Sequence, residues 1–205
     1  MTYTTEHNFV ISANKTGYTN RNWTLTAFER IKWAYDQFGE CLALISSFGP
    51  QSIVTLSLAR AVNPHIPVVM INVPGPEYDV QRQYRDYLKI SLKLNLHAVQ
   101  AEGLDQKKVA LYEYLSALGV QATIDGIRWD QTENRAQKEF LEHDPNFPNI
   151  KKIHPLVDWS DERTYEFIEQ LPVELRHPNY KRGVQSVGGA LLSAEQAKTE
   201  CGLHI

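Results

Sequence analysis

The sequence predicts a single α/β domain built on a doubly wound, mostly parallel sheet with helices on both faces. Short, continuous apolar runs alternate along the chain with longer segments whose apolar residues recur at helical spacing. With 205 residues, of which 42% are hydrophobic, the chain can bury one substantial core. No internal repeat or Gly/Ser-rich linker divides it. Strands alternating with helices imply parallel βαβ units joined by right-handed crossovers.

The first half of the chain sets this alternation. A mostly helical apolar stripe over Trp23–Phe38 ends at Gly39 and predicts a helix. The run Cys41–Ile45 is short and wholly apolar, which is typical of a strand buried on both faces. A second helix is expected over Ile53–Val62 and a second buried strand over Ile66–Val73. Together these segments form the first βαβ unit.

The second half continues the pattern. A helix rich in Tyr, Arg and Lys is expected over Tyr78–Leu94, followed by a strand over Leu96–Gln100. A further helix over Lys107–Leu118 leads into a strand over Val120–Ile124. Ser160 and the acidic residues after it favour a helix N-terminus, so a last helix should run to about Gln170.

Charge and hydropathy exclude several classes of function. A formal net charge of -3 and a pI near 6.2 argue against bulk attraction to nucleic acid or to anionic membranes. The apolar stretches are too short to span a bilayer, and the segment Met1–Glu6 has no charged region followed by an apolar one. We therefore expect a cytoplasmic protein with neither a signal peptide nor a membrane or nucleic-acid partner.

Cysteine usage limits the cofactors. Cys41 and Cys201, without any Cys-x-x-Cys, cannot supply all the thiolates of an iron–sulfur cluster or of an all-cysteine zinc site. Cys41 stands at the head of a buried strand and is predicted to be a small core residue. Four histidines show no metal-ligand spacing, so no metal is predicted; they are His7, His65, His97 and His143.

Cys201 is the first candidate for chemistry. It lies four residues from the end of the chain, in the polar segment Glu200–His204, which is too short to need a cysteine for packing. His204 and Lys198 are placed to stabilise its thiolate, which is the reactive form. A thiol on a mobile tail over residues 189–205 would swing into a site on the domain 1–188, take a group and pass it to a second protein. The alternative is a stray terminal cysteine.

The segment Ser46–Ser52 is the second candidate, because it follows the first predicted strand. In a doubly wound sheet, ligands bind beyond the carboxyl ends of the strands. Small residues let backbone N–H groups approach an anion, serine hydroxyls add donors, and the next helix contributes a positive N-terminus. The segment matches neither G-x-G-x-x-G nor G-x-x-x-x-G-K-[ST]. It is therefore either a distinct phosphate-binding loop or an ordinary strand-to-helix turn capped by serine.

Five motifs in order carry a resemblance to a known family. Ser46–Ser52 resembles the modified phosphate loop of the phosphoadenosine phosphosulfate (PAPS) reductase family, relatives of the PP-loop ATP pyrophosphatases. Gly126–Ala136 resembles its Gly-Leu-Arg-Arg-Glu-Gln-Ser segment with the downstream Arg-Ala. Lys152–Trp159 resembles its Lys-Val-x-Pro-Ile-x-Asp-Trp. The last two matches are His177-Pro178 with Gly183–Gly188, similar to His-Pro-Leu and Gly-Tyr-x-Ser-Val-Gly, and the terminal Glu-Cys-Gly-Leu-His at 200–204.

The resemblance implies a fold and an activity. The fold would be of the PP-loop, adenine nucleotide alpha hydrolase-like type. The enzyme would reduce PAPS to sulfite and adenosine 3′,5′-bisphosphate through an S-sulfo intermediate on Cys201, which thioredoxin or glutaredoxin then resolves. A homodimer is the family expectation. Members that use an iron–sulfur cluster carry a Cys-Cys pair and a Cys-x-x-Cys, so this chain resembles the cluster-free type, and a preference for PAPS follows from resemblance alone.

The resemblance also implies a substrate site. Arg128 and Arg135 are expected to bind phosphate, because arginine has a planar fork suited to phosphate oxygens. Without the resemblance, both fit equally well as parts of a solvated charged loop. Lys108 and Lys152 could equally be surface residues without a binding role. His177 could instead form a hydrogen bond within the turn before Pro178. The expected substrate-binding residues are Ser46, Ser47, Phe48, Gly49, Gln51, Ser52, Lys108, Arg128, Arg135, Lys152, His177, Lys198 and His204.

Two other functions compete with the reductase. A PP-loop ATP pyrophosphatase or adenylating enzyme would need a Ser-Gly-Gly-x-Asp-Ser type of loop, and Ser46–Gly49 argues against it. A non-catalytic nucleotide-binding module is the other alternative. It is favoured by the stretch Gly189–Thr199, where Lys198 is the one basic residue, whereas the reductases usually carry arginines there.

Overall fold

A computed structural model gives the conformation of most of the chain. Cys201, Lys198 and His204 lie outside the described part, as does most of the predicted tail 189–205, so their predicted roles stay predictions. The residues that the structure describes are 26–72, 79–102, 106–144, 147–181, 184–187 and 190–193.

The centre of the fold is a six-stranded sheet with the order β3-β2-β1-β4-β6-β5. Neighbouring strands are parallel except β5, which is antiparallel to β6. This confirms the predicted doubly wound, mostly parallel α/β fold. The strands are β1 (Leu42–Ile45), β2 (Pro67–Asn72), β3 (Asn95–Gln100), β4 (Ala122–Ile124), β5 (Leu141–Asp144) and β6 (Phe147–Ile153).

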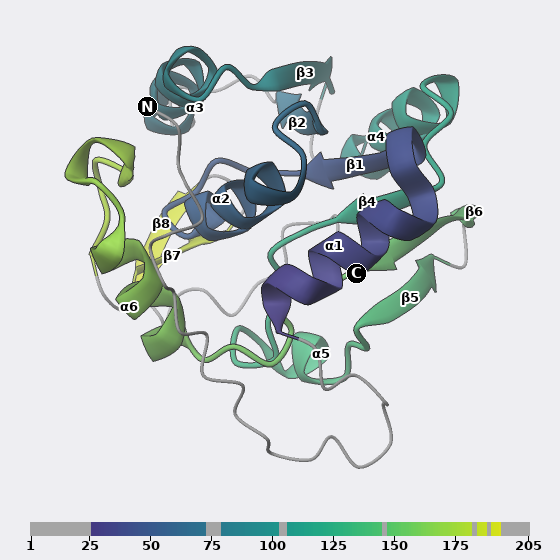
Figure 1. The fold of residues 1–205 in the computed structure, drawn as a ribbon. Coiled ribbons are helices and arrows are strands. Elements are labelled where there is room, and N and C mark those ends of the chain that lie inside the picture. The colour runs from purple at the N-terminus through teal and green to yellow at the C-terminus, as the bar shows by residue number, and fades with distance from the viewer. Residues whose placement is uncertain are drawn as a thin grey trace.

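Helices connect the parallel strands and cover both faces of the sheet. Figure 1 shows α1 in front of β4 and β6, with α2 beside it, while α4 packs on the opposite face. The helices are α1 (Ala27–Phe38), α2 (Ser52–Val62), α3 (Asp79–Ser91), α4 (Lys107–Ala117), α5 (Glu133–Ala136) and α6 (Asp161–Gln170), with short 3-10 turns at η1 (Gly39–Cys41) and η3 (Val173–Leu175). A separate antiparallel pair consists of β7 (Val184–Val187) and β8 (Ala190–Ser193).

Helix α1 has clear signals at both ends. Thr26 and Glu29 form a capping box, in which the Thr26 hydroxyl accepts from the Glu29 N–H at 3.3 Å and Glu29 Oε2 accepts from the Thr26 N–H at 2.7 Å. Ile31 and Ala34 lie on its buried face. The helix ends at Gly39, whose φ of 51° lies in the left-handed region that favours glycine.

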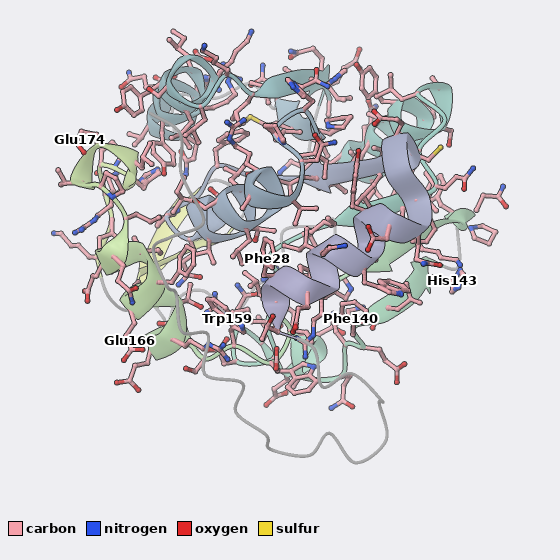
Figure 2. The ribbon with its side chains drawn as sticks, viewed as in Figure 1. Phe28, Phe140, His143, Trp159, Glu166 and Glu174 are labelled. Carbon is pink, nitrogen blue, oxygen red and sulfur yellow. The ribbon has the colours of Figure 1, made fainter. Side chains whose placement is uncertain are left out.

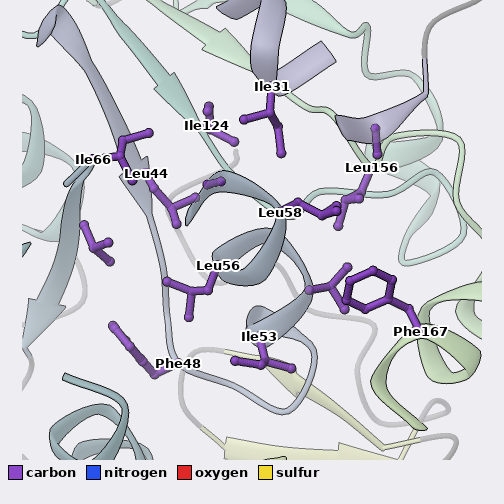
Figure 3. Close-up of a cluster of buried hydrophobic side chains, with 14 of the residues drawn as sticks. Ile31, Leu44, Phe48, Ile53, Leu56, Leu58, Ile66, Ile124, Leu156 and Phe167 are labelled. Atoms are coloured by element: carbon purple, nitrogen blue, oxygen red, sulfur yellow. The ribbon is translucent and has the colours of Figure 1, made fainter. Parts of the chain in front are cut away.

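Two apolar layers hold the sheet between the helices. Along β1, Leu42 and Leu44 face α1 and α2, whereas Ala43 faces α4. This alternation is the expected consequence of the two-residue period of a strand. Figure 3 shows Leu44 and Ile124 among the side chains of the larger layer. The rigid sheet between the two layers fixes the positions of the loops at its carboxyl edge.

Several features differ from the sequence predictions. Cys41 is half-buried in η1, one residue ahead of β1, and is not the core residue that the apolar run predicted. The predicted strands end with Val120–Ile124, so β5, β6, β7 and β8 were not predicted. Strand β5, for example, is a short and largely polar segment without a clear two-residue period. Among the described helices, none combines the length and apolar character needed to cross a bilayer.

Candidate functional site

The topology marks one position in the sheet as the place to look for a site. From β1 the chain moves outward through β2 to β3, and it then returns to the other side of β1 with β4. The strand order therefore reverses between β1 and β4, and ligands of such sheets bind in the crevice outside the carboxyl ends at that reversal. Residues 46–52 follow β1 and residues 125–132 follow β4, so both segments border this position.

Internal hydrogen bonds shape the loop after β1. The Ser46 hydroxyl accepts from the Phe48 N–H at 3.2 Å, and both the N–H and the hydroxyl of Ser52 donate to the Gly49 carbonyl, at 3.0 and 2.7 Å. The Ser52 hydroxyl proton is therefore committed within the loop, whereas Ser47 is exposed. Of the predicted serines, Ser47 is the exposed one, and it lies in the loop that leads into α2, where an anion would gain from the helix N-terminus.

Phe48 gives the loop its sharp turn. Its φ of 54° lies in the left-handed region, which costs a non-glycine residue about 1–2 kcal/mol. Its side chain is fully buried in the larger apolar layer, and Figure 3 shows it in the cluster that Ile53 and Leu56 of α2 also enter. The buried ring holds the backbone in a conformation that is otherwise unfavourable, which is common at functional sites. The buried Phe48 ring thus holds the backbone of this loop in its turn.

Three side chains join the two loops to helix α6 in a closed ring of hydrogen bonds. Arg128 Nη1 donates to Gln51 Oε1 at 2.6 Å, and Arg128 Nη2 donates to Asp161 Oδ1 at 2.7 Å. Gln51 Nε2 closes the ring by donating to the same Asp161 oxygen at 2.7 Å. We call this set of three residues the Arg128 ring. It fixes the N-terminus of α2 against that of α6.

In this structure the Arg128 side chain is buried and bonded to other protein side chains. The guanidinium is only 1% exposed, and its Nε donates to Asp130 at 3.0 Å. Two carboxylates, Asp130 and Asp161, therefore balance one cation. The structure brings Gln51 and Arg128, two of the predicted site residues, into contact, and direct contact of Arg128 with a phosphate stays a prediction. Asp161 was missed, since an acid at the start of a helix is common without any further role.

The other predicted basic residues occupy different positions. Arg135 lies in the single turn of α5 and donates to Gln131 Oε1 at 2.5 Å, an oxygen that also accepts from the Arg128 N–H at 3.1 Å. Arg135 is thus linked to the loop after β4. Lys152 Nζ lies 5.7 Å from the centre of the Tyr112 ring, on the α4 face of the sheet. Lys108 is half-buried in the first turn of α4, which begins after the edge strand β3.

His177 is buried and electrically neutral. It is 2% exposed, its ring lies edge-on to Tyr84 at 4.7 Å, and its Nδ1 accepts from the Asn179 N–H at 3.1 Å. Burial lowers the pKa of His177 to about 4. Since Nδ1 accepts, the single ring proton is on Nε2, and this nitrogen has no hydrogen-bond partner among the described residues. A buried donor of this kind fits a binding role as well as a turn.

Gly126, in the loop after β4, lies close to Thr55 of α2. A Cβ at this position would lie 3.1 Å from Thr55 Oγ1. That hydroxyl oxygen is buried and has no hydrogen-bond partner among the described atoms. The close approach explains why a glycine precedes Ile127 and Arg128 here. Thr55 was not singled out from the sequence, because a threonine inside a helix carries no distinguishing pattern.

The sequence is similar to those of known proteins. The family model of the phosphoadenosine phosphosulfate reductase domain matches residues 105–195. A phosphoadenosine 5′-phosphosulfate reductase of Yersinia pseudotuberculosis is 30% identical over 217 residues, covering 88% of this chain and 87% of the relative. An adenosine 5′-phosphosulfate reductase of Geobacillus kaustophilus is 30% identical over 232 residues, covering 94% of this chain and 96% of the relative.

Solved structures share the fold at lower identity. An FMN adenylyltransferase of Candida glabrata superposes with a TM-score of 0.62 and 14% identity, covering 82% of this chain and 60% of that one. Yeast FAD synthetase in complex with FAD gives a TM-score of 0.56 at 16% identity, covering 69% of this chain and 56% of that one. These likenesses place the sheet and its helices among PP-loop, adenine nucleotide alpha hydrolase-like folds.

Proposed function

Because this chain belongs to the phosphoadenosine phosphosulfate reductase family, a family of oxidoreductases, we propose that it reduces PAPS to sulfite and adenosine 3′,5′-bisphosphate. One observation carries the proposal: the loop Ser46–Ser52 lies at the strand-order reversal of the sheet, in a chain that is 30% identical to such a reductase over 88% of its length. The exposed Ser47 hydroxyl and the start of α2 favour a phosphate there.

The proposed chemistry is carried by Cys201. Its thiolate attacks the sulfur of the sulfonate, an S–S bond forms, and the S–O bond to the phosphate breaks, so adenosine 3′,5′-bisphosphate leaves with the electron pair. A thiolate of reduced thioredoxin or glutaredoxin then attacks Cys201 Sγ and releases sulfite. The second thiol of that donor resolves the mixed disulfide and restores Cys201. Two electrons pass from the dithiol to sulfur in one cycle, and Lys198 and His204 would stabilise the thiolate.

The substrate-binding part of the proposal divides the predicted residues into two groups. Gln51, Phe48 and Arg128 hold the two loops in shape through the Arg128 ring and the buried Phe48 ring. Ser47 and the Nε2–H of His177 have donors that are not used by other described residues, so they would contact the nucleotide directly. Each donor placed on a phosphate or sugar oxygen adds affinity, and more so for a charged acceptor.

The finer features of the proposal follow from the resemblance. With two cysteines and no Cys-x-x-Cys, the chain would work without an iron–sulfur cluster, and PAPS rather than adenosine phosphosulfate would be the preferred substrate. We also propose a homodimer in the cytoplasm, where thioredoxin or glutaredoxin keeps thiols reduced.

A sulfite-release assay tests the proposal. Wild type, Cys201→Ser and the matched control Cys41→Ser would each be incubated with PAPS and reduced thioredoxin, and in parallel with adenosine phosphosulfate. Cys41 lies ahead of β1, at the edge of the sheet opposite the loop 46–52, so this control should retain activity. Cys201→Ser should release no sulfite while still binding adenosine 3′,5′-bisphosphate. Mass spectra of wild type without thioredoxin should show a sulfonate on the Cys201 peptide.

Other outcomes would identify the competing functions. Conversion of ATP to AMP and pyrophosphate without sulfite release would point to a PP-loop pyrophosphatase or adenylating enzyme. Tight nucleotide binding by wild type, with neither sulfite nor AMP formed, would point to a non-catalytic binding module. Either result would overturn the reductase proposal.

A further inference from the structure

A buried histidine lies directly beneath the loop after β4. Strands β4 and β6 are parallel neighbours, and Ile124 is in register with Ile153. The residues that follow these two, Asp125 and His154, are therefore adjacent at the carboxyl edge. His154 is fully buried, and its Nδ1 lies 2.7 Å from Asp125 Oδ1.

A second carboxylate faces the other nitrogen of this histidine. Glu142 Oε2 on β5 lies 3.7 Å from His154 Nε2, which is an electrostatic contact rather than a hydrogen bond. Burial by itself would lower the pKa of His154, but the Asp125 and Glu142 carboxylates outweigh it and raise the pKa to about 9. At neutral pH the ring is thus an imidazolium held between two carboxylates.

Glu142 is itself fixed in place. It accepts from the Glu139 N–H at 2.7 Å, and Lys138 Nζ lies 3.3 Å away. Burial would raise the pKa of Glu142, yet the interactions with His154, the Glu139 N–H and Lys138 lower it to about 2. The cation of His154 is therefore anchored to the hairpin of β5 and β6 on one side and to the end of β4 on the other.

The same Asp125 oxygen also determines the path of the site loop. Asp125 Oδ1 accepts from the Ile127 N–H at 3.0 Å, and the Asp125 N–H donates to the Ile153 carbonyl at 3.2 Å. Ile127 is followed by Arg128, whose side chain closes the ring with Gln51 and Asp161. One contiguous set of contacts thus connects the hairpin to the loop after β1.

A contribution to stability alone does not account well for this cluster. Replacing a buried ion pair by apolar side chains of similar volume is often neutral or stabilising, because removing charges from water is costly. Apolar side chains in place of His154 and both of its carboxylate partners would fill the same volume without that cost. Buried ionic groups of this kind instead fix one geometry, and here the geometry that they fix is the exit of the site loop from β4.

We propose that His154 is a positioning residue: held between Asp125 and Glu142, it fixes the direction in which residues 125–128 leave β4 and so keeps Arg128 and Gln51 in the arrangement that receives the nucleotide. This proposal deepens the reductase function and rests on it. His154 itself touches neither the substrate nor Cys201 in this account. Its effect should therefore appear in substrate affinity rather than in the chemical step.

Two substitutions of similar size separate positioning from packing. His154→Leu fills the volume and removes both nitrogens, whereas His154→Asn keeps an amide donor near the position of Nδ1. His143→Asn is the matched control, because His143 is an exposed histidine on the same hairpin, as Figure 2 shows at its outer edge. KM and kcat for PAPS, and the affinity for adenosine 3′,5′-bisphosphate by calorimetry, would be measured for each at a temperature where every variant is folded.

Positioning predicts a specific pattern. His154→Leu should raise KM for PAPS and weaken the binding of adenosine 3′,5′-bisphosphate, each by roughly tenfold or more, which is the loss expected for one charged hydrogen bond. The value of kcat should change by less than about threefold. His154→Asn should recover most of that affinity, and His143→Asn should equal wild type. If His154→Leu instead leaves KM for PAPS and the affinity for adenosine 3′,5′-bisphosphate unchanged, the histidine does not position the loop for the nucleotide and the proposal is wrong.

Amide hydrogen exchange tests the role of His154 even if the protein is not a reductase. In His154→Leu, amides of residues 125–131 should exchange faster than in wild type, while those of Leu111–Leu115 in α4 should not change. Absence of sulfite release and of nucleotide binding in wild type, together with this local change, would overturn the reductase but leave the link between His154 and the loop standing. Equal exchange at residues 125–131 in both proteins would overturn the link.

Discussion

Arg128 Nη2 lies 2.7 Å from Asp161 Oδ1, and this ion pair joins the loop after β4 to the first residue of α6. Gln51 bridges the same two side chains, so three segments that are far apart in the sequence meet in one ring of hydrogen bonds. An acid at the first turn of α6 also suits the positive end of that helix. The candidate site is therefore held by mutual contacts of its own side chains as well as by the sheet.

Arg128→Lys tests how much the Arg128 ring contributes. Lysine keeps the charge but lacks the planar fork, so it cannot donate simultaneously to Gln51, Asp130 and Asp161 in the observed geometry. Loss of one or two charged hydrogen bonds in a buried position should lower the free energy of unfolding by about 2–4 kcal/mol. Urea denaturation measures this change, and an unchanged midpoint would show that the Arg128 ring does not stabilise the fold.

Asp161→Asn tests the same Arg128 ring with a milder change. Asparagine keeps an oxygen that accepts from Arg128 and Gln51 but removes the charge, so the destabilisation should be smaller than in Arg128→Lys. The order of the two effects distinguishes hydrogen-bond geometry from charge. A larger effect of Asp161→Asn would show that charge neutralisation of Arg128 is the greater contribution.

Phe48→Gly sets two opposing effects against each other. Glycine relieves the strain of a φ of 54°, which is a gain of about 1–2 kcal/mol. It also removes a fully buried ring, and truncation of a buried phenylalanine costs about 3–5 kcal/mol. The two ranges together predict a net loss of about 1–4 kcal/mol of unfolding free energy. Phe48→Ala, which keeps the strain and loses the ring, should be less stable than Phe48→Gly by thermal or urea denaturation.

Much of the fold could be predicted because its signals are local. The apolar run at Leu42–Ile45 and the capping residues of α1 and α6 each depend on a few neighbouring residues, and the structure contains these elements within a few positions of the predictions. The parallel arrangement followed from their alternation. Strands β5 and β6 were both missed, because their antiparallel pairing is a tertiary contact that the polar sequence of β5 does not reveal.

The site was only partly predictable, for the same physical reason. The loop 46–52 and Arg128 stand out by type and spacing, but the partners of Arg128 depend on three-dimensional contacts. Asp161 looked like a helix-capping acid. His154 occupied a variable place in its motif, and the register of β4 with β6 is what brings it beside Asp125. A sequence alone gives no such register.

The raised pKa of His154 predicts how stability depends on pH. A base whose pKa rises from 6.5 to about 9 on folding contributes stability that is fully present below pH 6.5 and is lost as pH rises through 9. As pH rises from 6.5 to 9, the free energy of unfolding of wild type should therefore fall relative to that of His154→Leu. His177, with its pKa lowered to about 4, changes its contribution only below pH 6.5 and does not disturb this window.

Denaturation at several pH values within that window measures the effect. His143→Asn serves again as the control, because it removes an exposed histidine of the same hairpin and leaves the contacts of His154 with Asp125 and Glu142 in place. A constant difference between wild type and His154→Leu from pH 6.5 to 9 would show that the ring is neutral in the folded protein.

Gly126 and Thr55 provide a test of the close approach between the loop after β4 and α2. In Gly126→Ala the new methyl group would lie 3.1 Å from Thr55 Oγ1, so one of the two must move by a few tenths of an ångström. Thr55 is buried in a helix, where a β-branched side chain has few rotamers, so the loop is expected to shift instead. Gly126→Ala should lower the unfolding free energy by about 1–3 kcal/mol, the usual cost of overpacking. It should also weaken binding of adenosine 3′,5′-bisphosphate, because residues 127 and 128 move with the loop.

A second substitution at Thr55 identifies the clash as the cause. Thr55→Ala removes the oxygen that the new methyl group meets, whereas Thr55→Val keeps an atom of similar size in its place. In a double-mutant cycle, Thr55→Ala should recover about 1 kcal/mol of the loss caused by Gly126→Ala, and Thr55→Val should recover none. If both substitutions at Thr55 were simply additive with Gly126→Ala, the effect of the alanine would come from the backbone freedom of glycine. The loop would then depend on the conformation of residue 126 and not on its distance from α2.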